Sequence, residues 1–536
     1  MTSSLPRAVR PRRAAPHWCV RAARAALGGT AGIAWLALPV MTINSGTAVA
    51  AGVLPRAGPA AAGTAAPQQD ETSGADLVLP LVAVGAAVVG AGYGYVRRTR
   101  RARTRTTPGG GGLDDTGEVG RLDERARQAL TLVDDCVRTS REELGFVEAR
   151  TGGGAAVAPY AGTVRQAGTE LATAFGQHLR YDGGVPAGPA ARRQVLADVI
   201  GRCEDAGRLL DAAADGFDDV RGLDRGVGGA VEVAESRFRA LAARTPATEA
   251  VLLGLVRRFA PSASDQVAGY AERAKDRLMF ATVHLNQARQ QADRGENGRA
   301  VTHLRAAEGA VAQAEVFLDG IERLAAELDE AASMVPAALS GAEAERAGAQ
   351  ARLTAVPPGE IRARVLHADA VLASVRQELA SGRPHDPLGV LRRVVAAAAP
   401  LGAGHTGVLS AAILLTARSA TTAAADFVTT HRGAVGAGAR ALLTEAERLL
   451  ASNAPADHLR ADALAREAQT HAEQDVRTHG NPYAEADLHN PGTAGAVLGG
   501  ILLSPSPSPT APAPAPAPAP SFGGPGTRAR RVTSCS

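Results

Sequence analysis

The sequence predicts an all-α protein with long antiparallel helical hairpins and coiled coil in a cytoplasmic region, one transmembrane helix and a disordered tail. Three observations predict this fold class. Apolar residues recur at three- and four-residue steps over much of the chain, which is the helical period. Only 3% of the residues are aromatic, which disfavours β-sandwiches and barrels because their strands need aromatic and β-branched residues. No stretch alternates apolar and polar residues convincingly enough to predict a strand.

The first 50 residues have the pattern of a secretory signal peptide. Residues 1–24 contain six arginines and no acidic residue, residues 25–41 are apolar, and Ala48-Val49-Ala50 supplies an A-x-A cleavage site. The alternative is an uncleaved first membrane helix, which would give the same orientation to everything after residue 96. Residues 51–76 are then a short extracytoplasmic linker.

Residues 77–96 are predicted to be a transmembrane helix. This stretch has 20 residues without a charge, and at 1.5 Å per residue it spans about 30 Å, the thickness of the hydrocarbon core of a bilayer. An arginine cluster follows at once, formed by Arg97, Arg98, Arg100, Arg101, Arg103 and Arg105. Because positively charged residues stay on the cytoplasmic side, we expect a single-pass protein of the plasma membrane with a cytoplasmic C-terminal region.

Small residues form one stripe of this predicted helix. Ala86, Gly90 and Gly94 recur every four residues, and small residues at this spacing allow two helices to approach closely. One interpretation is self-association through this face. The other is that glycine and alanine are simply common in this chain.

A helical coiled-coil region is predicted over residues 119–355, after a basic, glycine-rich linker at 97–118. Its clearest pattern runs to Val335, with apolar residues three and four positions apart over about five heptads. The large residues of this seam are Leu304, Val311, Leu318, Ile321, Leu328 and Val335. A periodic helix before it and the turn Gly295–Gly298 predict an antiparallel hairpin.

The remainder of the chain is predicted to form a second helical region and a tail. Pro357-Pro358-Gly359 ends the first region, and a second helical region is predicted over residues 360–480. Residues 481–536 are predicted to be a disordered, proline-rich tail, because a Ser/Thr/Ala-Pro tract favours extended polyproline II structure.

Few side chains are candidates for chemistry. Lys275 is the only lysine and lies in no Gly-Lys-Ser/Thr motif, which excludes a P-loop, and the few aromatics disfavour stacking of nucleic-acid bases. Cys203 falls on an apolar helix face and is expected to be a core thiol. We assign no catalytic residue, cofactor or metal.

Other polar groups are expected to be solvated. His284 and His303 flank the predicted hairpin turn among charged neighbours, which favours surface positions. The acidic pairs Asp134-Asp135 and Glu142-Glu143 are expected on a solvated helix face.

Several segments resemble those of one known family. They are Tyr93–Arg98 with the arginines up to Pro108, Asp134–Ser140, Ala274–Leu278, Leu304–Val311, Phe427–Gly436 and Ser521–Gly524. In these segments the chain resembles actinobacterial TPM-domain membrane proteins, in which an extracytoplasmic TPM domain precedes the membrane helix. Some TPM domains are linked to phosphatase activity or metal binding. Residues 51–76 are too few for that domain, so the resemblance implies a shortened relative and carries over no site residue.

Together these patterns predict a membrane-anchored helical protein with a structural or scaffolding role and no catalysis. Its expected partners are the membrane and a protein, or a second copy of itself, and not nucleic acid. The alternatives are a signalling or sensor membrane protein and a relative of the TPM-domain phosphatases.

Overall fold

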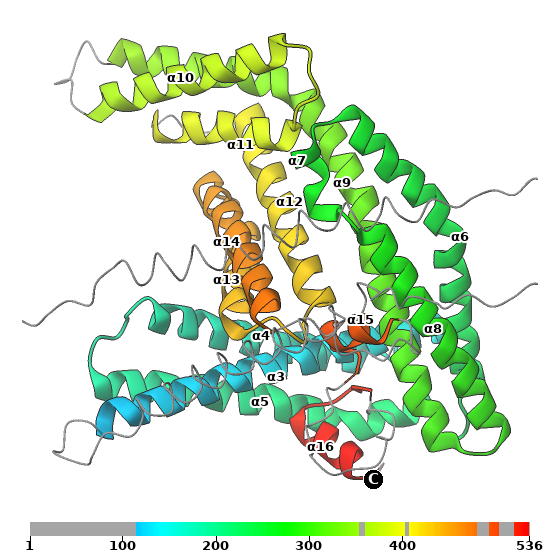
Figure 1. The fold of residues 1–536 in the computed structure, drawn as a ribbon. Coiled ribbons are helices and arrows are strands. Elements are labelled where there is room, and N and C mark those ends of the chain that lie inside the picture. Colours follow the sequence, from blue (N-terminus) through cyan, green and yellow to red (C-terminus); the bar gives the residue numbers. More distant parts are fainter. Residues whose placement is uncertain (1–113, 353–359, 402–406, 480–491, 503–518, 535–536) are drawn as a thin grey trace, which may run out of the picture. The chain divides into compact units, whose positions relative to one another are not determined.

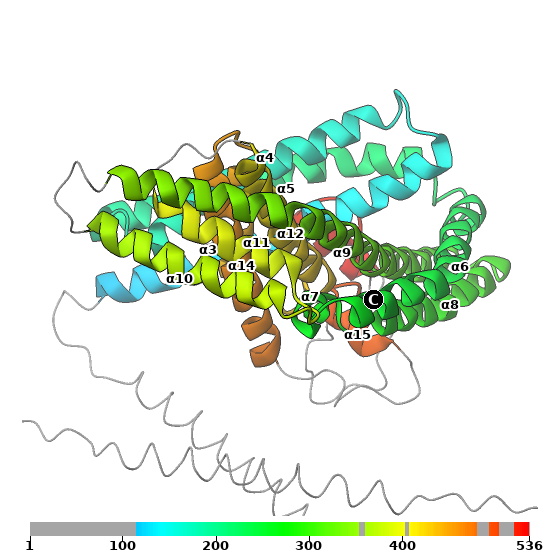
Figure 2. The same cartoon turned by 90° about the horizontal axis from the view of Figure 1, so that it is seen from above.

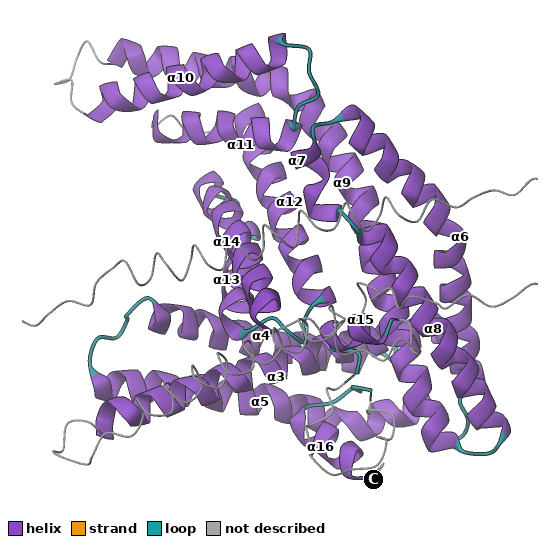
Figure 3. Cartoon of the chain, viewed as in Figure 1, coloured by secondary structure: helices purple, strands orange, loops and turns teal. Residues whose placement is uncertain are grey.

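The computed structural model describes residues 114–352, 360–401, 407–479, 492–502 and 519–534, which lie in one compact unit, residues 108–536. Helices account for most of these residues, and no strand occurs among them (Figure 3). The predicted all-α class is therefore confirmed. The predicted signal peptide, extracytoplasmic linker and transmembrane helix lie outside the described residues.

Three long helices form the first bundle. They are α3 (Asp114–Thr151), α4 (Ala158–Asp182) and α5 (Pro189–Arg221). The periodic apolar residues that predict these helices, such as Leu171 of α4 and Leu210 of α5, are buried in a shared core. The three helices lie side by side in Figure 1 and contact one another pairwise.

A second group of helices surrounds the longest helix of the described chain. Its members are α6 (Gly228–Arg258), α7 (Pro261–Ser264), the short 3-10 helix η2 (Asp265–Val267), α8 (Tyr270–Asp293) and α9 (Asn297–Arg352). α8 and α9 are joined by residues 294–296 and pack against one another. The heptad pattern predicts a helix up to Val335, whereas α9 continues through Pro336 to its end.

The third group packs onto α9 and onto the first bundle. It comprises α10 (Glu360–Ala380), α11 (Pro387–Ala398), η3 (Ala399–Leu401), α12 (Val408–Thr430), α13 (Ala437–Leu450) and α14 (Pro455–His479). α10, α11 and α12 contact α9, and α10 runs beside α9 in the view from above (Figure 2). α13 contacts α3 and α4, so this group connects the first bundle with α9.

One described helix, α12, is long and apolar enough to cross a membrane by length and composition. More than half of its apolar window is buried inside the fold, against α9, α11 and α14. This burial is typical of the central helix of a folded core. The predicted membrane span at residues 77–96 is a different segment, outside the described residues.

The prediction of a disordered tail is wrong for two segments. α15 (Thr493–Leu498) and α16 (Pro525–Ser534) are helical, and Ile501 and Phe522 beside them are buried. Apolar residues flanked by glycine allow these short segments to pack closely on the helical body, although their composition is typical of disorder.

Candidate functional site

The predicted coiled-coil seam lies inside the fold. Its six large residues are buried: Leu304, Val311, Leu318, Ile321, Leu328 and Val335. They belong to one core with residues of α6, α8, α11 and α12. The seam is therefore filled by helices of the same chain. The membrane-edge arginines (Arg97, Arg98, Arg100, Arg101, Arg103, Arg105) and the small-residue face (Ala86, Gly90, Gly94) lie outside the described residues.

Residues 519–534 pack on a surface of the first bundle, which we call the groove, and this surface is the best-defined candidate site among the described residues. Phe522 is 0% exposed and its ring stacks on Phe217 of α5, with ring centroids 4.0 Å apart. Tyr160 of α4 meets both rings edge-on, at 5.5 Å from Phe217 and 6.3 Å from Phe522. Such aromatic contacts add about 0.5–1.5 kcal/mol each beyond the buried area.

The segment after Phe522 approaches α5 so closely that a side chain at Gly524 would not fit. A Cβ on Gly524 would lie 2.1 Å from the carbonyl oxygen of Gly207, and a Cβ on Gly207 would lie 2.9 Å from Cδ of Pro525. Gly523 has a φ of 122°, which disfavours residues with a side chain, and its N–H donates to Ser140 Oγ of α3. The local sequence Phe-Gly-Gly-Pro therefore matches the groove sterically.

Polar contacts fix the direction of the bound segment. The N–H groups of Gly526 and Thr527, in the first turn of α16, donate to the carboxylate of Asp211 at 3.2 and 2.7 Å. A carboxylate at a helix N-terminus is favourable because it satisfies free N–H groups and the helix dipole. At the other end of α16, Arg531 pairs with Asp218 and donates to the carbonyl of Phe522.

A buried charged centre lies beside the groove. Arg221, at the end of α5, pairs with Glu143 of α3 and Glu308 of α9, and all three side chains are buried. Burial alone would raise the pKa of Glu143, but Arg221 and Arg305 hold it below its usual value. Burial keeps the pKa of Glu308 raised despite Arg221. This centre joins α3, α5 and α9.

A second set of buried pairs joins the first bundle to α13. Arg440 pairs with Asp134 and Asp135 at 2.6 and 2.7 Å, and Arg432 holds Glu142 with two hydrogen bonds of 2.6 and 3.0 Å.

The expectation that the acidic pairs of α3 lie on a solvated face is therefore wrong. Asp134 and Glu143 are buried, and Asp135 and Glu142 are largely covered. Asp134 also pairs with Arg138 one turn along α3, but Arg432 and Arg440 come from other parts of the chain, up to 306 positions away. Sequence spacing within α3 alone could not reveal these pairs.

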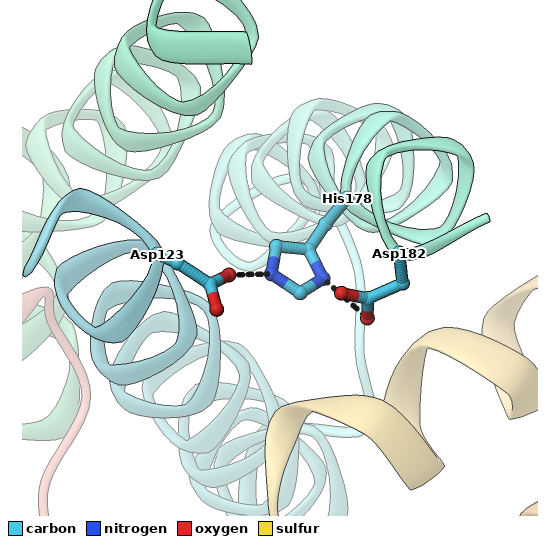
Figure 4. Close-up of side chains that lie close together, drawn as sticks. All are labelled: Asp123, His178 and Asp182. Carbon is cyan, nitrogen blue, oxygen red and sulfur yellow. Dashed lines mark hydrogen bonds and ion pairs between the residues drawn. The ribbon is translucent and has the colours of Figure 1, made fainter. Parts of the chain in front are cut away.

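Asp123, His178 and Asp182 form the one described cluster of three potential metal ligands. His178 is fully buried, with Nε2 3.1 Å from Asp123 and Nδ1 3.3 Å from Asp182, so the imidazole lies between the two carboxylates (Figure 4). Arg127 also contacts both carboxylates, at 3.2 and 2.9 Å. Because each imidazole nitrogen faces a different carboxylate and Arg127 offsets part of the charge of the two carboxylates, the cluster fits a bridging hydrogen-bonded imidazole better than a metal site. Sequence inspection missed it because Asp123 is 55 positions from His178.

The histidines flanking the α8–α9 turn are not the surface groups that the sequence predicts. His303 is buried, and its Nδ1 lies 3.1 Å from Nδ1 of His284. Burial and the neighbouring His303 lower the pKa of His284 to about 4. By contrast, Cys203 is buried as predicted, and burial raises the pKa of its thiol to about 12. It is therefore a core thiol.

Comparison with known proteins gives one kind of relative. UPF0603 proteins from two strains of Mycobacterium tuberculosis are each 28% identical to this chain over 412 residues. The alignment covers 71% of this chain but 61% of each relative, so the chain spans less than two thirds of their length. No family model matches the chain, and no solved structure matches it. The chain is thus similar to UPF0603 proteins of an actinobacterium.

Proposed function

We propose that this chain is a membrane-anchored helical protein with a structural or interaction role and no catalysis, whose cytoplasmic body binds short peptide segments. The observation that carries the proposal is the groove on α3, α4 and α5. It combines an aromatic slot, a closely fitted glycine pair and a carboxylate that receives a helix N-terminus. These are the features of a surface that recognises a peptide by shape and direction.

The helical body supplies a rigid support for that groove. In the proposal α8 and α9 act as an antiparallel hairpin with coiled-coil packing, and their seam stabilises the body internally. The buried pairs of Arg221 and Arg440 tie this support to α3 and α5. Rigid elements hold a recognition site more precisely than loops do.

The membrane anchor is proposed from the sequence. Residues 77–96 form the span, and the arginines after them keep the body on the cytoplasmic side. The groove then faces cytoplasmic proteins and other copies anchored in the same membrane.

Two measurements test this function. Chemical crosslinking of the full chain in isolated membranes should yield adducts with a protein partner or with another copy, and strictly monomeric chain would contradict the proposal. Purified chain in detergent should hydrolyse no phosphate monoester, with or without divalent metal. Hydrolysis that co-purifies with the chain would instead favour the phosphatase relationship.

A further inference from the structure

We propose that the groove on α3, α4 and α5 accepts residues 519–534 of a second copy of this chain, so that exchanged C-terminal segments join neighbouring copies. The inference rests on the proposed function and deepens it by naming the partner. The groove is defined by Ser140, Tyr160, Gly207, Asp211 and Phe217.

Residues 519–534 can be treated as a ligand because the residues that contact the groove lie close together in the sequence, between Phe522 and Arg531. Phe522 fills the aromatic slot, Gly524 fits against Gly207, and Arg531 pairs with Asp218. These three contacts are all with α5, and Ala519 at the start of the segment also packs against the core around α9. None of these contacts depends on which copy supplies the segment. Exchange between copies therefore keeps the same contacts and changes only the effective concentration of the ligand.

The sequence before the segment is long enough for exchange. Residues 503–518 consist mainly of serine, alanine and proline. Sixteen residues of any sequence can span at most about 55 Å. Anchoring in a common membrane keeps neighbouring copies near one another and raises the effective concentration of each tail for the next groove.

We expect the groove to form without the segment because Phe522 is the one residue that the segment contributes to the buried core of the first bundle. Leu130 of α3, Leu171 of α4 and Leu196 of α5 are buried together in the first bundle. Loss of the segment uncovers Phe217 and Tyr160 but leaves this core intact. A copy whose own tail cannot bind thus presents an open groove.

Two full-length variants separate the donor of the segment from its acceptor. Gly524→Ala places a methyl group 2.1 Å from a backbone oxygen, so this acceptor has a free groove and a tail that cannot bind. Gly207→Leu fills the groove opposite Pro525, so this donor keeps a competent tail. Gly201→Leu is the matched control, because a Cβ at Gly201 on the same helix meets nothing within 4 Å.

The first measurement uses a fluorescent peptide of residues 519–534 with the detergent-purified full chain. Fluorescence anisotropy should show binding to the acceptor, loss of binding when the acceptor also carries Gly207→Leu, and retention with Gly201→Leu. A peptide with Phe522→Ala should bind about 30-fold more weakly or worse, as expected for a central aromatic anchor. Absence of peptide binding to a fully helical acceptor would overturn the proposal.

The second measurement mixes differently tagged donor and acceptor in one bilayer nanodisc preparation. Neither variant should capture a second copy of itself, whereas the mixture should form pairs that excess peptide dissociates. Peptide binding without donor–acceptor pairs would overturn the exchange between copies. That result would leave the proposed function standing, because the body would still bind a peptide, whereas loss of both would remove the groove as its basis.

Discussion

Single buried arginines hold together helices that lie far apart in the sequence. Arg221 lies between Glu143 and Glu308, and burial alone would lower its pKa, but these two carboxylates raise it. A buried pair contributes little net stability compared with apolar packing, yet loss of one partner leaves the other charges unpaired. Removal of Arg221 should therefore be poorly tolerated by the fold.

Arg221→Met is expected to destabilise the fold by about 3–5 kcal/mol, because two buried carboxylates lose their shared partner. Urea unfolding followed by circular dichroism measures this change. Arg225→Met is the control, since the Arg225 side chain is 73% exposed and surface changes usually stay within about 0.5 kcal/mol. Equal effects of the two substitutions would contradict the buried centre.

Stability is expected to fall below pH 6.5 because of buried histidines. Burial and the charge of Arg273 lower the pKa of His431 from 6.5 to about 4, so the unfolded chain binds a proton there before the folded chain does. The associated stability is complete above pH 6.5 and is lost as the pH falls to about 4, at up to about 1.4 kcal/mol per pH unit.

His431→Gln should flatten that pH dependence. Unfolding free energies measured between pH 7 and pH 4 should fall less steeply for the variant, because the buried titrating group is gone. His471→Gln changes an exposed residue of α14 and should leave the slope unchanged. The explanation fails if the slope of His431→Gln equals that of the unsubstituted chain.

At the level of helices, the spacing of apolar residues predicts which segments are helical and which helix face is buried. Leu304, Val311 and Leu318 recur at heptad spacing, which places them on one face of α9, and that face is buried. The spacing does not reveal what covers the face. The seam shares its core with helices from several other parts of the chain, which a heptad pattern cannot distinguish from a second copy.

The C-terminal segments and the charged centre were missed for a related reason. Composition around Phe522 indicates flexibility, because glycine and proline are favourable there only when a partner surface is present. That surface is formed by α3–α5. Asp211 of α5, for example, lies more than 300 positions before the residues that it contacts. Likewise, Arg440 and Asp134 become partners only when α13 packs on α3.

Leu318→Ala is expected to lower the free energy of unfolding by about 2–5 kcal/mol, because loss of the buried side chain leaves a cavity in the core around α9. The loss should not depend on protein concentration, because the seam packs within one chain. Leu366→Ala on α10, where the side chain is 60% exposed, is the control. Thermal unfolding at two concentrations checks this, and a concentration-dependent loss would indicate a seam shared between copies.

α15 depends on close approach at Gly433. The Gly433 N–H donates to the carbonyl of Leu498 at 2.8 Å, and an added Cβ would lie 2.4 Å from the carbonyl oxygen of Val497. Gly433→Ala should therefore displace α15, at a cost of about 1–3 kcal/mol. Faster hydrogen exchange of the α15 amides would show this, whereas Gly438→Ala, with no atom within 4 Å of the added Cβ, should leave exchange unchanged.

At the scale of the whole molecule, the proposed membrane anchor is residues 77–96. Deletion of residues 77–96 is expected to release the protein from carbonate-washed membranes, although the variant still contains α12, because α12 is engaged in the folded core. Fractionation followed by immunodetection measures the release. Retention of the deletion variant in the membrane would instead assign an anchoring role to another segment.

The contact between the first bundle and residues 519–534, which lie far apart in the sequence, has a consequence during synthesis. α3, α4 and α5 leave the ribosome before Phe522, which is translated roughly 300 residues after the end of α5. At about 5–20 residues per second, the roughly 300 intervening residues take about 15–60 s. For that time every nascent chain carries an uncovered Phe217, which a chaperone or the finished tail of a neighbouring chain can occupy first.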